Sequence, residues 1–410
     1  MNILLIQTGI TKEQQKAMGE GNIHRVNMPM LGLLYLAALT PPEHQLTVID
    51  ENHGLIEKYE KYDIVGISGM TMHAERMYAL ADIYRNLGCH VVLGGVHVSF
   101  MIQEALEHCD TVMVKEGEVT WLQFLKDFEE GRAKKVYETE IVTDLARLPR
   151  PPRELVDGEA YKAPHGTLNS IVATRGCPNH CTFCCVRKMF DKCFRIRPVD
   201  SIVDEIKGMD ENIIIFQDDN IVGNFSFARE LFTKIRPLNR LWGAQGSINV
   251  AANRELLHLM ADSGCRTLFV GFESINPKNL LAIGKSGVNR ISQYEENIRK
   301  IHDCGIKIFG SFIVGLDDDD DGVFDHIYEF CYKNQIDFPI VNCLTPFPGT
   351  ELFEALDREN RILDKTWSRY NLTNVLVKPL HMSADKMQFE YNTLVHYLNK
   401  MTYENMKKFK

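Results

Sequence analysis

The stretch 174-TRGCPNHCTFCCV-186 decides how the rest of the chain is interpreted. It places Cys177, Cys181 and Cys184 at the spacing C-x3-C-x2-C, and Cys185 follows at once. Three thiolates this close in sequence can bind one metal centre from a single loop. Structural zinc usually takes four ligands from two separated pairs, whereas a [4Fe–4S] cluster takes up to four thiolates. Three cysteines would hold such a cluster and leave one iron open to another ligand.

Two other interpretations of these cysteines remain open. A zinc ion could be completed by His180 or Cys193, or the thiols could be free by coincidence. Cys185 is not counted as a ligand, because in extended or helical backbone its side chain points away from that of its neighbour. We expect Cys185 to pack against the rest of the fold.

Composition limits the class of protein. The chain has 410 residues, 45% hydrophobic and 25% charged, which is typical of a soluble globular protein with two or three domains. No apolar run approaches the roughly 20 residues that span a bilayer. A net charge of −9 argues against a broad nucleic-acid surface. The N-terminus resembles a strand more than a signal peptide, and eleven cysteines then indicate reduced thiols in the cytoplasm.

The first part of the chain alternates apolar runs with amphipathic segments. The runs lie at 2–7, 45–49, 63–68, 90–95 and 111–115, and the helical patterns near 31–39, 72–87, 99–107 and 118–130. This alternation predicts an α/β domain over residues 1–145, with a parallel sheet covered by helices on both faces. Five strands suggest a flavodoxin-like (Rossmann-like) order, with a ligand crevice at the carboxyl ends of the strands.

A proline-rich linker over 146–167 separates this domain from a second series. Its apolar runs lie at 170–174, 213–216, 242–248, 267–272, 307–315 and 338–344. Six strand–helix units predict an open partial (β/α)6 barrel over 168–365, with its chemistry at the C-terminal ends of the strands. The cysteine cluster follows the first of these strands. Residues 366–410 are expected to form a helical cap or lid, and 317-DDDDD-321 to form a helix N-terminus, where negative charge is favourable.

With Phe183 before Cys184, the motif C-x3-C-x-φ-C resembles the signature of the radical S-adenosylmethionine (SAM) superfamily, in which φ is an apolar residue. Four further stretches resemble motifs of that barrel: 216-FQDDNIVGN-224, 264-GCRTLFVGFES-274 with Lys285 downstream, 310-GSFIVGL-316 and 345-TPFPGTEL-352. Four stretches of the first half resemble the class B members, which carry a B12-binding domain: 28-MPMLGLLYLAAL-39, 94-GGVHVSF-100, 114-VKEGEVTW-121 and 148-LPRPPRELVD-157. The resemblance covers nearly the whole chain.

The resemblance implies an anaerobic chemistry with three cofactors. Cys177, Cys181 and Cys184 would hold a [4Fe–4S] cluster whose open iron chelates SAM. One electron, from a reductase such as flavodoxin or ferredoxin, would cleave SAM to a 5′-deoxyadenosyl radical. With cobalamin present, the expected outcome is methylation of an unactivated carbon of a small-molecule, peptide or lipid substrate. The alternatives are a cyclase, ring-rearranging enzyme or oxidoreductase of the same family, and a non-catalytic iron–sulfur or cobalamin sensor or carrier.

A methylthiotransferase is largely rejected, because that family brings three further cluster cysteines and residues 1–150 hold only Cys89 and Cys109.

Candidate cofactor contacts follow from the resemblance and from the strand ends. For SAM they are Phe183, Asp219, Ser247, Asn249, Glu273 and Ser274. Asp219 is preferred to Asp218, because two adjacent carboxylates cannot both point into one site. For cobalamin they are Ser68, Gly69, Thr71, Gly94, Gly95, His97, Glu116 and Gly117, which could otherwise be ordinary tight turns of a domain that only caps the barrel. His53 has the wrong spacing for a lower cobalt ligand and is expected in a surface loop.

Overall fold

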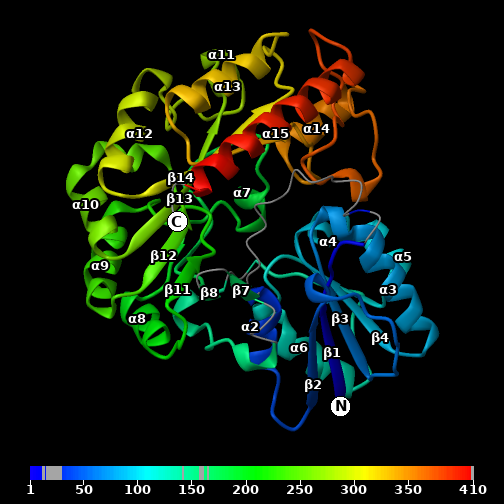
Figure 1. The fold of residues 1–410 in the computed structure, drawn as a ribbon. Helices are drawn as coiled ribbons and strands as arrows, with labels where there is room; N and C mark the ends of the chain where they lie inside the picture. The colour runs from blue at the N-terminus through cyan, green and yellow to red at the C-terminus, as the bar shows by residue number, and fades with distance from the viewer. Residues whose placement is uncertain (12–13, 15–29, 141–142, 157–160, 164–165, 408–410) are drawn as a thin grey trace.

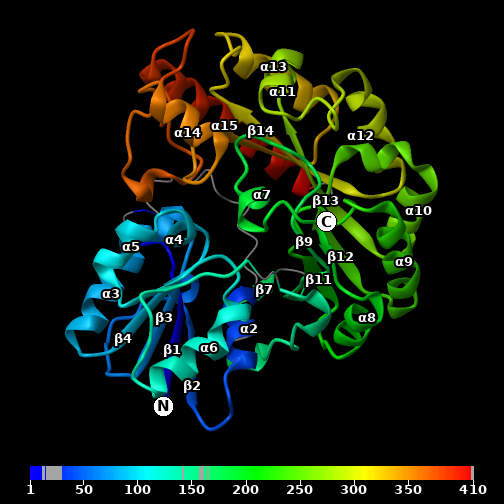
Figure 2. The same cartoon turned by 180° about the vertical axis from the view of Figure 1, so that it is seen from behind.

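The computed structural model describes residues 1–11, 14, 30–140, 143–156, 161–163 and 166–407. Residues 28–29 of one quoted motif, parts of the predicted linker (157–160 and 164–165) and the end of the predicted cap (408–410) lie outside these residues. The described chain forms two lobes, each built around its own sheet (Figures 1 and 2). Among the described residues, none of the helices combines the length and apolar character needed to cross a membrane.

The N-terminal lobe is a parallel sheet of six strands in the order β2-β1-β3-β4-β5-β6. The strands are β1 (Asn2–Gln7), β2 (Gln45–Asp50), β3 (Ile64–Ser68), β4 (His90–Gly94), β5 (Thr111–Met113) and β6 (Val136–Tyr137). The first five strands follow the flavodoxin-like order that the sequence predicted, and β6 was not predicted. All their pairings are parallel, so the strands' carboxyl ends lie at one edge.

Helices cover both faces of this sheet, as expected. They are α2 (Leu31–Leu39), α3 (Ala74–Asn86), α4 (Val96–Phe100), α5 (Ile102–His108) and α6 (Gly117–Glu129). Alternate residues of β1 point to opposite faces. Leu4 and Ile6 pack in the core on the α3 side, and Ile3 and Leu5 pack in the core on the α2 and α6 side. This two-sided burial explains why the strand is a continuous apolar run.

The second lobe holds a seven-stranded sheet in the order β15-β14-β13-β12-β11-β8-β7. Its strands are β7 (Lys162–Ala163), β8 (Gly166–Ile171), β11 (Ile213–Phe216), β12 (Leu241–Gln245), β13 (Cys265–Glu273), β14 (Lys307–Val314) and β15 (Phe338–Cys343). Six are parallel, and only the short β7 pairs antiparallel, with β8. The sheet does not close on itself, which confirms the open six-unit barrel.

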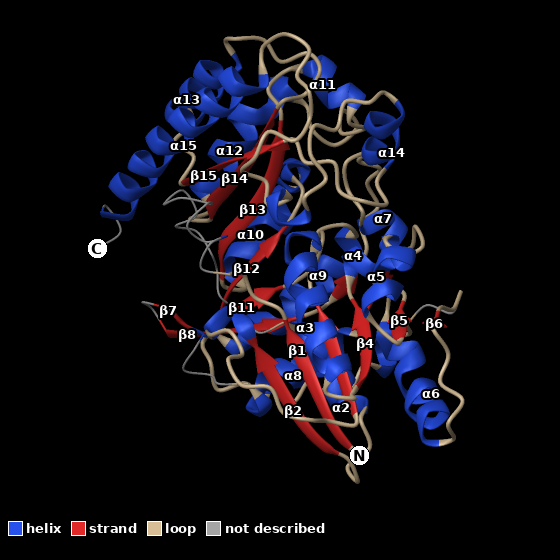
Figure 3. Cartoon of the chain, turned by 90° about the vertical axis from the view of Figure 1, so that its right-hand side faces the viewer, coloured by secondary structure: helices blue, strands red, loops and turns tan. Residues whose placement is uncertain are grey.

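Outer helices follow the barrel strands (Figure 3). They are α8 (Val199–Lys207), α9 (Phe225–Ile235), α10 (Arg254–Asp262), α11 (Pro277–Ala282), α12 (Tyr294–Asp303), α13 (Val323–Lys333) and α14 (Glu351–Arg358). The last helix, α15 (Ala384–Lys407), lies along the outermost strand, β15. Tyr391 Oη on this helix donates to the carbonyl of Val341, 3.4 Å away. The helix therefore covers an edge that would otherwise expose unpaired backbone groups.

A small antiparallel ribbon closes the cysteine loop at its base. It pairs β9 (Thr174–Arg175) with β10 (Arg195–Ile196), with Arg175 opposite Arg195. The loop between them carries the short helix α7 (Val186–Met189), which lies between the two lobes in Figures 1 and 2. The predicted strand 170–174 is therefore wrong in its bounds, since β8 ends at Ile171 and a separate short strand follows.

Other predicted bounds were also wrong. The helix expected near 99–107 is two helices, α4 and α5, so that His97 is helical. The strand expected over 242–248 ends at Gln245 and is followed by the 3-10 helix η7 (Ile248–Ala252). The five aspartates precede α13, whose N-cap is Gly322. Asp319 instead accepts hydrogen bonds from the amides of Gly315 and Leu316, so it shapes the turn after β14.

Candidate functional site

The three spaced cysteines share the loop that the ribbon closes, and all are free thiols. Burial raises the pKa of Cys177, Cys181 and Cys184, and the neighbouring thiols raise those of Cys181 and Cys184 further. The thiols are thus close enough to repel one another when ionised. Thiolates in such a setting need a positive partner, which a bound iron cluster would supply. The donor set therefore fits a three-cysteine [4Fe–4S] cluster.

For the zinc alternative, the two candidate completing ligands have other surroundings in the described structure. His180 is paired through Nε2 with Glu351 Oε1 at 3.0 Å on the surface, and Cys193 is exposed, with its thiol near the carbonyl of Asp191. Across the described residues, no three His, Cys, Asp or Glu side chains are placed to hold a single metal ion.

The end of β11 supports the cysteine loop through three consecutive side chains. Asp218 is buried and accepts hydrogen bonds from the amide and hydroxyl of Thr174, the latter at 2.6 Å. Asp219 accepts from the amide of Gly176 at 3.0 Å, directly before Cys177. The two carboxylates therefore point to different places. The preferred SAM candidate, Asp219, is the one beside the cysteine loop, and its role toward SAM stays a prediction.

Asn220, the next residue, connects two strand ends to the cluster site. Its Nδ2 lies 2.9 Å from Ser247 Oγ and 3.9 Å from Cys177 Sγ. Ser247 also lies 3.4 Å from Asn179 Nδ2 in the cysteine loop. The predicted Ser247 is therefore at the cluster side of the barrel, whereas Asn249 is exposed in η7.

Glu273 ends β13 in a strained backbone conformation, with φ of +63° at a bulge between β13 and β14. Such left-handed backbone costs roughly 1–3 kcal/mol in a non-glycine residue and tends to occur at functional sites. Glu273 is buried, and its Oε1 lies 2.9 Å from Lys285 Nζ. Burial alone would lower the pKa of Lys285, but Glu273 and Cys181 raise it. A charged lysine therefore lies between Glu273 and the cysteine loop.

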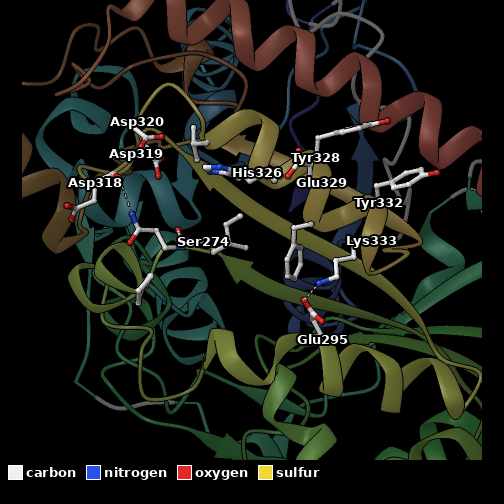
Figure 4. Close-up of a pocket in the computed structure, with 16 residues that line it drawn as sticks. Ser274, Glu295, Asp318, Asp319, Asp320, His326, Tyr328, Glu329, Tyr332 and Lys333 are labelled. Atoms are coloured by element: carbon white, nitrogen blue, oxygen red, sulfur yellow. Dashed lines mark hydrogen bonds and ion pairs between the residues drawn. The ribbon is translucent and has the colours of Figure 1, made fainter.

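For two predicted SAM contacts, Ser274 and Phe183, the side chain lies against other parts of the protein. Ser274 lines a cavity of about 750 Å³ between the segment that follows β13, the aspartates after β14 and α13, shown in Figure 4, and its Oγ accepts from the amide of Asn276. The side chain of Phe183 packs against the barrel core. The expected backbone contact of Phe183 with adenine stays a prediction.

A second cavity, of about 250 Å³, lies at the carboxyl edge of the N-terminal sheet. Five of the eight predicted cobalamin residues line it: Ser68, Gly94, Gly95, Glu116 and Gly117. It continues between the sheet and helices α2 and α6, where Gly32 leaves room along its wall and the absence of a side chain at Gly66 makes space for that of Leu5. This mostly apolar space has the size and lining for an aromatic group such as the base on the cobalamin tail, so the residues present fit that part of the cofactor.

The remaining three predicted residues do not line this cavity. Gly69 is enclosed by Thr8 and Met77, and Thr71 begins a buried 3-10 helix, η2 (Thr71–His73). His97 is buried beside Tyr78, whose hydroxyl lies 3.1 Å from its Nε2. His53 is exposed in the 3-10 helix η1 (Glu51–His53), against the ring of Tyr161.

The cavity is not formed by the N-terminal lobe alone. Arg175, Met189 and Phe190, all from the ribbon and cysteine loop, complete its lining. Arg175 pairs with Glu116 and Glu118, each at 2.5 Å. Arg175 and Asn220 were not chosen from the sequence, although both lie inside quoted stretches. Their partners come from distant parts of the chain, which a single sequence does not reveal.

Comparison with known proteins agrees with this geometry. The family model for the radical SAM superfamily matches residues 171–331, and that for the B12 binding domain matches residues 26–125. A bacteriochlorophyllide d C-12(1)-methyltransferase of Chlorobaculum tepidum is 32% identical over 370 residues, 88% of this chain and 80% of the relative. A bacteriochlorophyllide d C-8(2)-methyltransferase of the same organism is 28% identical over 390 residues, 92% of this chain and 86% of the relative.

Among solved structures, the cobalamin-dependent SAM radical enzyme OxsB, with aqua-cobalamin and SAM bound, superposes with a TM-score of 0.70. The match covers 96% of this chain but 65% of OxsB, at 15% identity, and it shows the shared fold.

The barrel, the three-cysteine loop and these matches show that the chain belongs to the radical SAM superfamily. Within the superfamily it is one of the cobalamin-dependent enzymes with a B12-binding domain, and it is a methyltransferase that uses a [4Fe–4S] cluster, SAM and cobalamin.

Proposed function

We propose that this enzyme methylates an unactivated carbon of a ring-shaped, largely apolar small molecule of the bacteriochlorophyllide kind. The proposal rests on one observation: residues of the cysteine loop also line the cavity in which cobalamin is predicted to bind. Residues of the cysteine loop complete the glycine-lined cavity of the N-terminal lobe, so a cobalamin whose tail base occupied that cavity would lie beside the radical-forming site. Adjacent donor and radical sites are what transfer of a methyl group to a substrate carbon requires.

When bound, the cluster and SAM supply a carbon-centred radical, and methylcobalamin supplies the methyl group. The chain's own residues bind and orient these groups. Cys177, Cys181 and Cys184 are the cluster ligands, and Asp219 fixes the loop through the amide of Gly176. The buried pair of Glu273 and Lys285 holds charge of both signs near Cys181, where the polar end of SAM needs partners.

The choice of acceptor rests on the relatives. Two methyltransferases that match most of this chain act, by their names, on bacteriochlorophyllide d. Such acceptors are broad, apolar rings with few polar groups, and they are small molecules. The electron is proposed to come from a flavodoxin- or ferredoxin-type reductase, which a chemical reductant replaces in the test.

The test uses the full chain, purified without oxygen and loaded with iron, sulfide and hydroxocobalamin. It is then given dithionite, SAM with a trideuterated methyl group, and either bacteriochlorophyllide d, a pentacyclic lipid or no acceptor. We expect 5′-deoxyadenosine, and a trideuteromethyl group on the ring acceptor by mass spectrometry. A matched variant with alanine at Cys177, Cys181 and Cys184 should give neither product.

The outcomes separate the parts of the proposal. Labelling of the lipid alone would replace the acceptor class and keep methyl transfer. Consumption of the ring acceptor without label would indicate a cyclase or oxidoreductase instead. A colourless, inactive protein after loading would contradict the cofactor roles of the named residues.

A further inference from the structure

Charged side chains join the two lobes beside both cofactor sites. Glu116 is the N-cap of α6 and Glu118 lies in its first turn, and the ribbon under the cysteine loop supplies Arg175 and Arg195. Glu116 bonds Arg175 at 2.5 Å and Arg195 at 2.8 Å, and Glu118 bonds Arg175 at 2.5 Å. We call these four residues the interlobe clamp. A further pair, Lys115 with Asp191, lies nearby.

The interlobe clamp is buried and its charges balance. The side chains of Glu116, Glu118 and Arg175 are 7%, 9% and 11% exposed. A buried ion pair adds little net stability, because desolvation offsets the attraction, but removing one partner leaves an uncompensated charge. Such pairs are best suited to fixing one relative geometry. The planar guanidinium of Arg175 bridges two carboxylates through separate nitrogens, which adds directional precision that a lysine lacks.

Arg175 connects directly to both sites. It is two residues before Cys177, and it faces Arg195 across the ribbon that closes the cysteine loop. Its side chain, with those of Glu116 and Glu118, lines the glycine-lined cavity. Its guanidinium also lies 5.5 Å from the ring centre of Tyr35 on α2, the helix that covers this cavity. The side chain of Arg175 therefore contacts the N-terminal lobe at the predicted cobalamin cavity, while its backbone belongs to the ribbon that closes the cysteine loop.

We propose that Arg175 is a positioning residue that couples the two cofactor sites, so that an assembled cluster loop strengthens cobalamin binding and bound cobalamin stabilises the cluster loop. Coupling between binding sites is reciprocal by thermodynamic necessity. A cluster held by Cys177, two residues from Arg175, would restrain the loop and so hold Arg175 where it completes the cavity with Glu116 and Glu118. The inference concerns cofactor binding and is independent of which acceptor is methylated.

The test measures the dissociation constant for hydroxocobalamin by anaerobic titration of the full chain, with and without the reconstituted cluster. We expect the cluster to tighten binding about fivefold or more in the unchanged chain, within the usual range of coupling between sites. The quantity compared between variants is the dissociation constant without the cluster divided by the constant with it. In Arg175→Met this ratio should fall close to one. Arg175→Lys, which keeps the charge but loses the fork, should give an intermediate ratio.

The matched control is Arg197→Met, which removes a different buried ion pair, with Glu205 at 2.5 Å inside the barrel lobe. Its ratio should match that of the unchanged chain. Circular dichroism and iron content establish that each variant is folded and loaded, and Glu118→Gln serves as a second, milder variant of the interlobe clamp. Cluster retention, measured as the rate of iron loss to a chelator, should slow on adding cobalamin in the unchanged chain but not in Arg175→Met.

Three results would overturn the proposal. The first is equal cobalamin affinity with and without the cluster in the unchanged chain. The second is an unchanged ratio in Arg175→Met. The third is an equal loss of the ratio in Arg197→Met, which would show that general weakening of the fold, rather than the interlobe clamp, lowers cobalamin affinity.

Discussion

Neighbouring side chains in this protein have different surroundings, and Cys184 and Cys185 are the clearest pair. Cys184 is one of the three cysteines with the cluster spacing. Cys185, the next residue, is the N-cap of α7, so its backbone begins that helix. Replacing Cys177, Cys181 or Cys184 by Ala should each reduce bound iron and the brown chromophore severely, because a cluster with two protein ligands is poorly held. Iron analysis and absorbance of the anaerobically loaded protein measure this.

Cys185→Ala is the matched control, and Cys193→Ala is an exposed one. Both should keep most of the iron. If Cys185→Ala lost as much iron as Cys184→Ala, the assignment of the three ligands would be wrong.

The candidate residues named from the sequence were those marked by local spacing, and their roles stay predictions, whereas residues with distant partners were missed. The cysteine spacing and the choice of Asp219 over Asp218 depend on adjacent residues only. Arg175 acquires its role from Glu116 and Glu118, 59 and 57 positions away along the chain. A lone arginine before a cysteine motif gives no sign of such partners.

Among the structural elements, the cysteine loop depends most on a single backbone conformation. Gly176 has φ of +88°, and an added Cβ would collide with the carbonyl oxygen of Cys193 on the other side of the loop. Gly176→Ala should therefore cost about 1–3 kcal/mol or more in strain and prevent cluster loading. Thermal unfolding and iron content measure the two effects.

Gly287→Ala is a suitable control, because nothing lies within 4 Å of a Cβ added there. It should change neither the melting temperature nor the iron content appreciably. Normal loading of Gly176→Ala would show that the loop can adjust, and that the crossing near Cys193 is not required.

Element boundaries were harder to predict than element types. The strand–helix alternation gave both sheets, because apolar runs and amphipathic helices are local patterns. The aspartates at 317–321 precede α13 and do not form its first turn, for a physical reason. Asp319 is used inside the turn, and Asp317 pairs with Arg361 at 2.5 Å, so these acids bind specific partners instead of forming the first turn of α13.

For the whole molecule, the interlobe clamp makes stability depend on pH. Burial alone would raise the pKa of Glu116, but Arg195 and Arg175 hold it below its usual value of 4.5. A carboxyl group with a lowered folded-state pKa contributes stability above its unfolded pKa and loses it as the pH falls through the folded value. The contribution of Glu116 should therefore be complete above about pH 5 and disappear at lower pH.

Glu116→Gln tests this by thermal unfolding of the full chain over a pH series. The variant should be less stable by roughly 3 kcal/mol at neutral pH, because two buried arginines lose part of their compensation. The difference should shrink as the pH falls below 4.5, since the unchanged chain then loses the same charge. A difference that stayed constant down to pH 3 would mean that Glu116 acts through packing and not through its charge.

The arrangement of the lobes was beyond the sequence, and the C-terminal segment shows why. It was expected to form a helical cap or lid, and α15 is helical, but its 3-10 helix η9 (Trp367–Arg369) packs on the N-terminal lobe, which the sequence did not indicate. Trp367 Nε1 donates to Glu104 Oε1 at 2.7 Å, and its ring lies edge-on to His97 at 5.1 Å. These partners are more than 260 positions apart in the chain. No local pattern marks such a contact.

Trp367 thus joins the end of the chain to the N-terminal lobe, on a contact separate from the interlobe clamp. Trp367→Ala should remove a large buried side chain and cost about 3–5 kcal/mol. Trp367→Phe keeps most of the packing and loses the hydrogen bond to Glu104, for about 1 kcal/mol. If the segment holds the lobes together, Trp367→Ala should also split thermal unfolding into two transitions and open the chain to limited proteolysis between the lobes. A single cooperative transition with equal shifts in both variants would show that Trp367 contributes only its hydrogen bond, and that other contacts, the interlobe clamp among them, keep the two lobes in register.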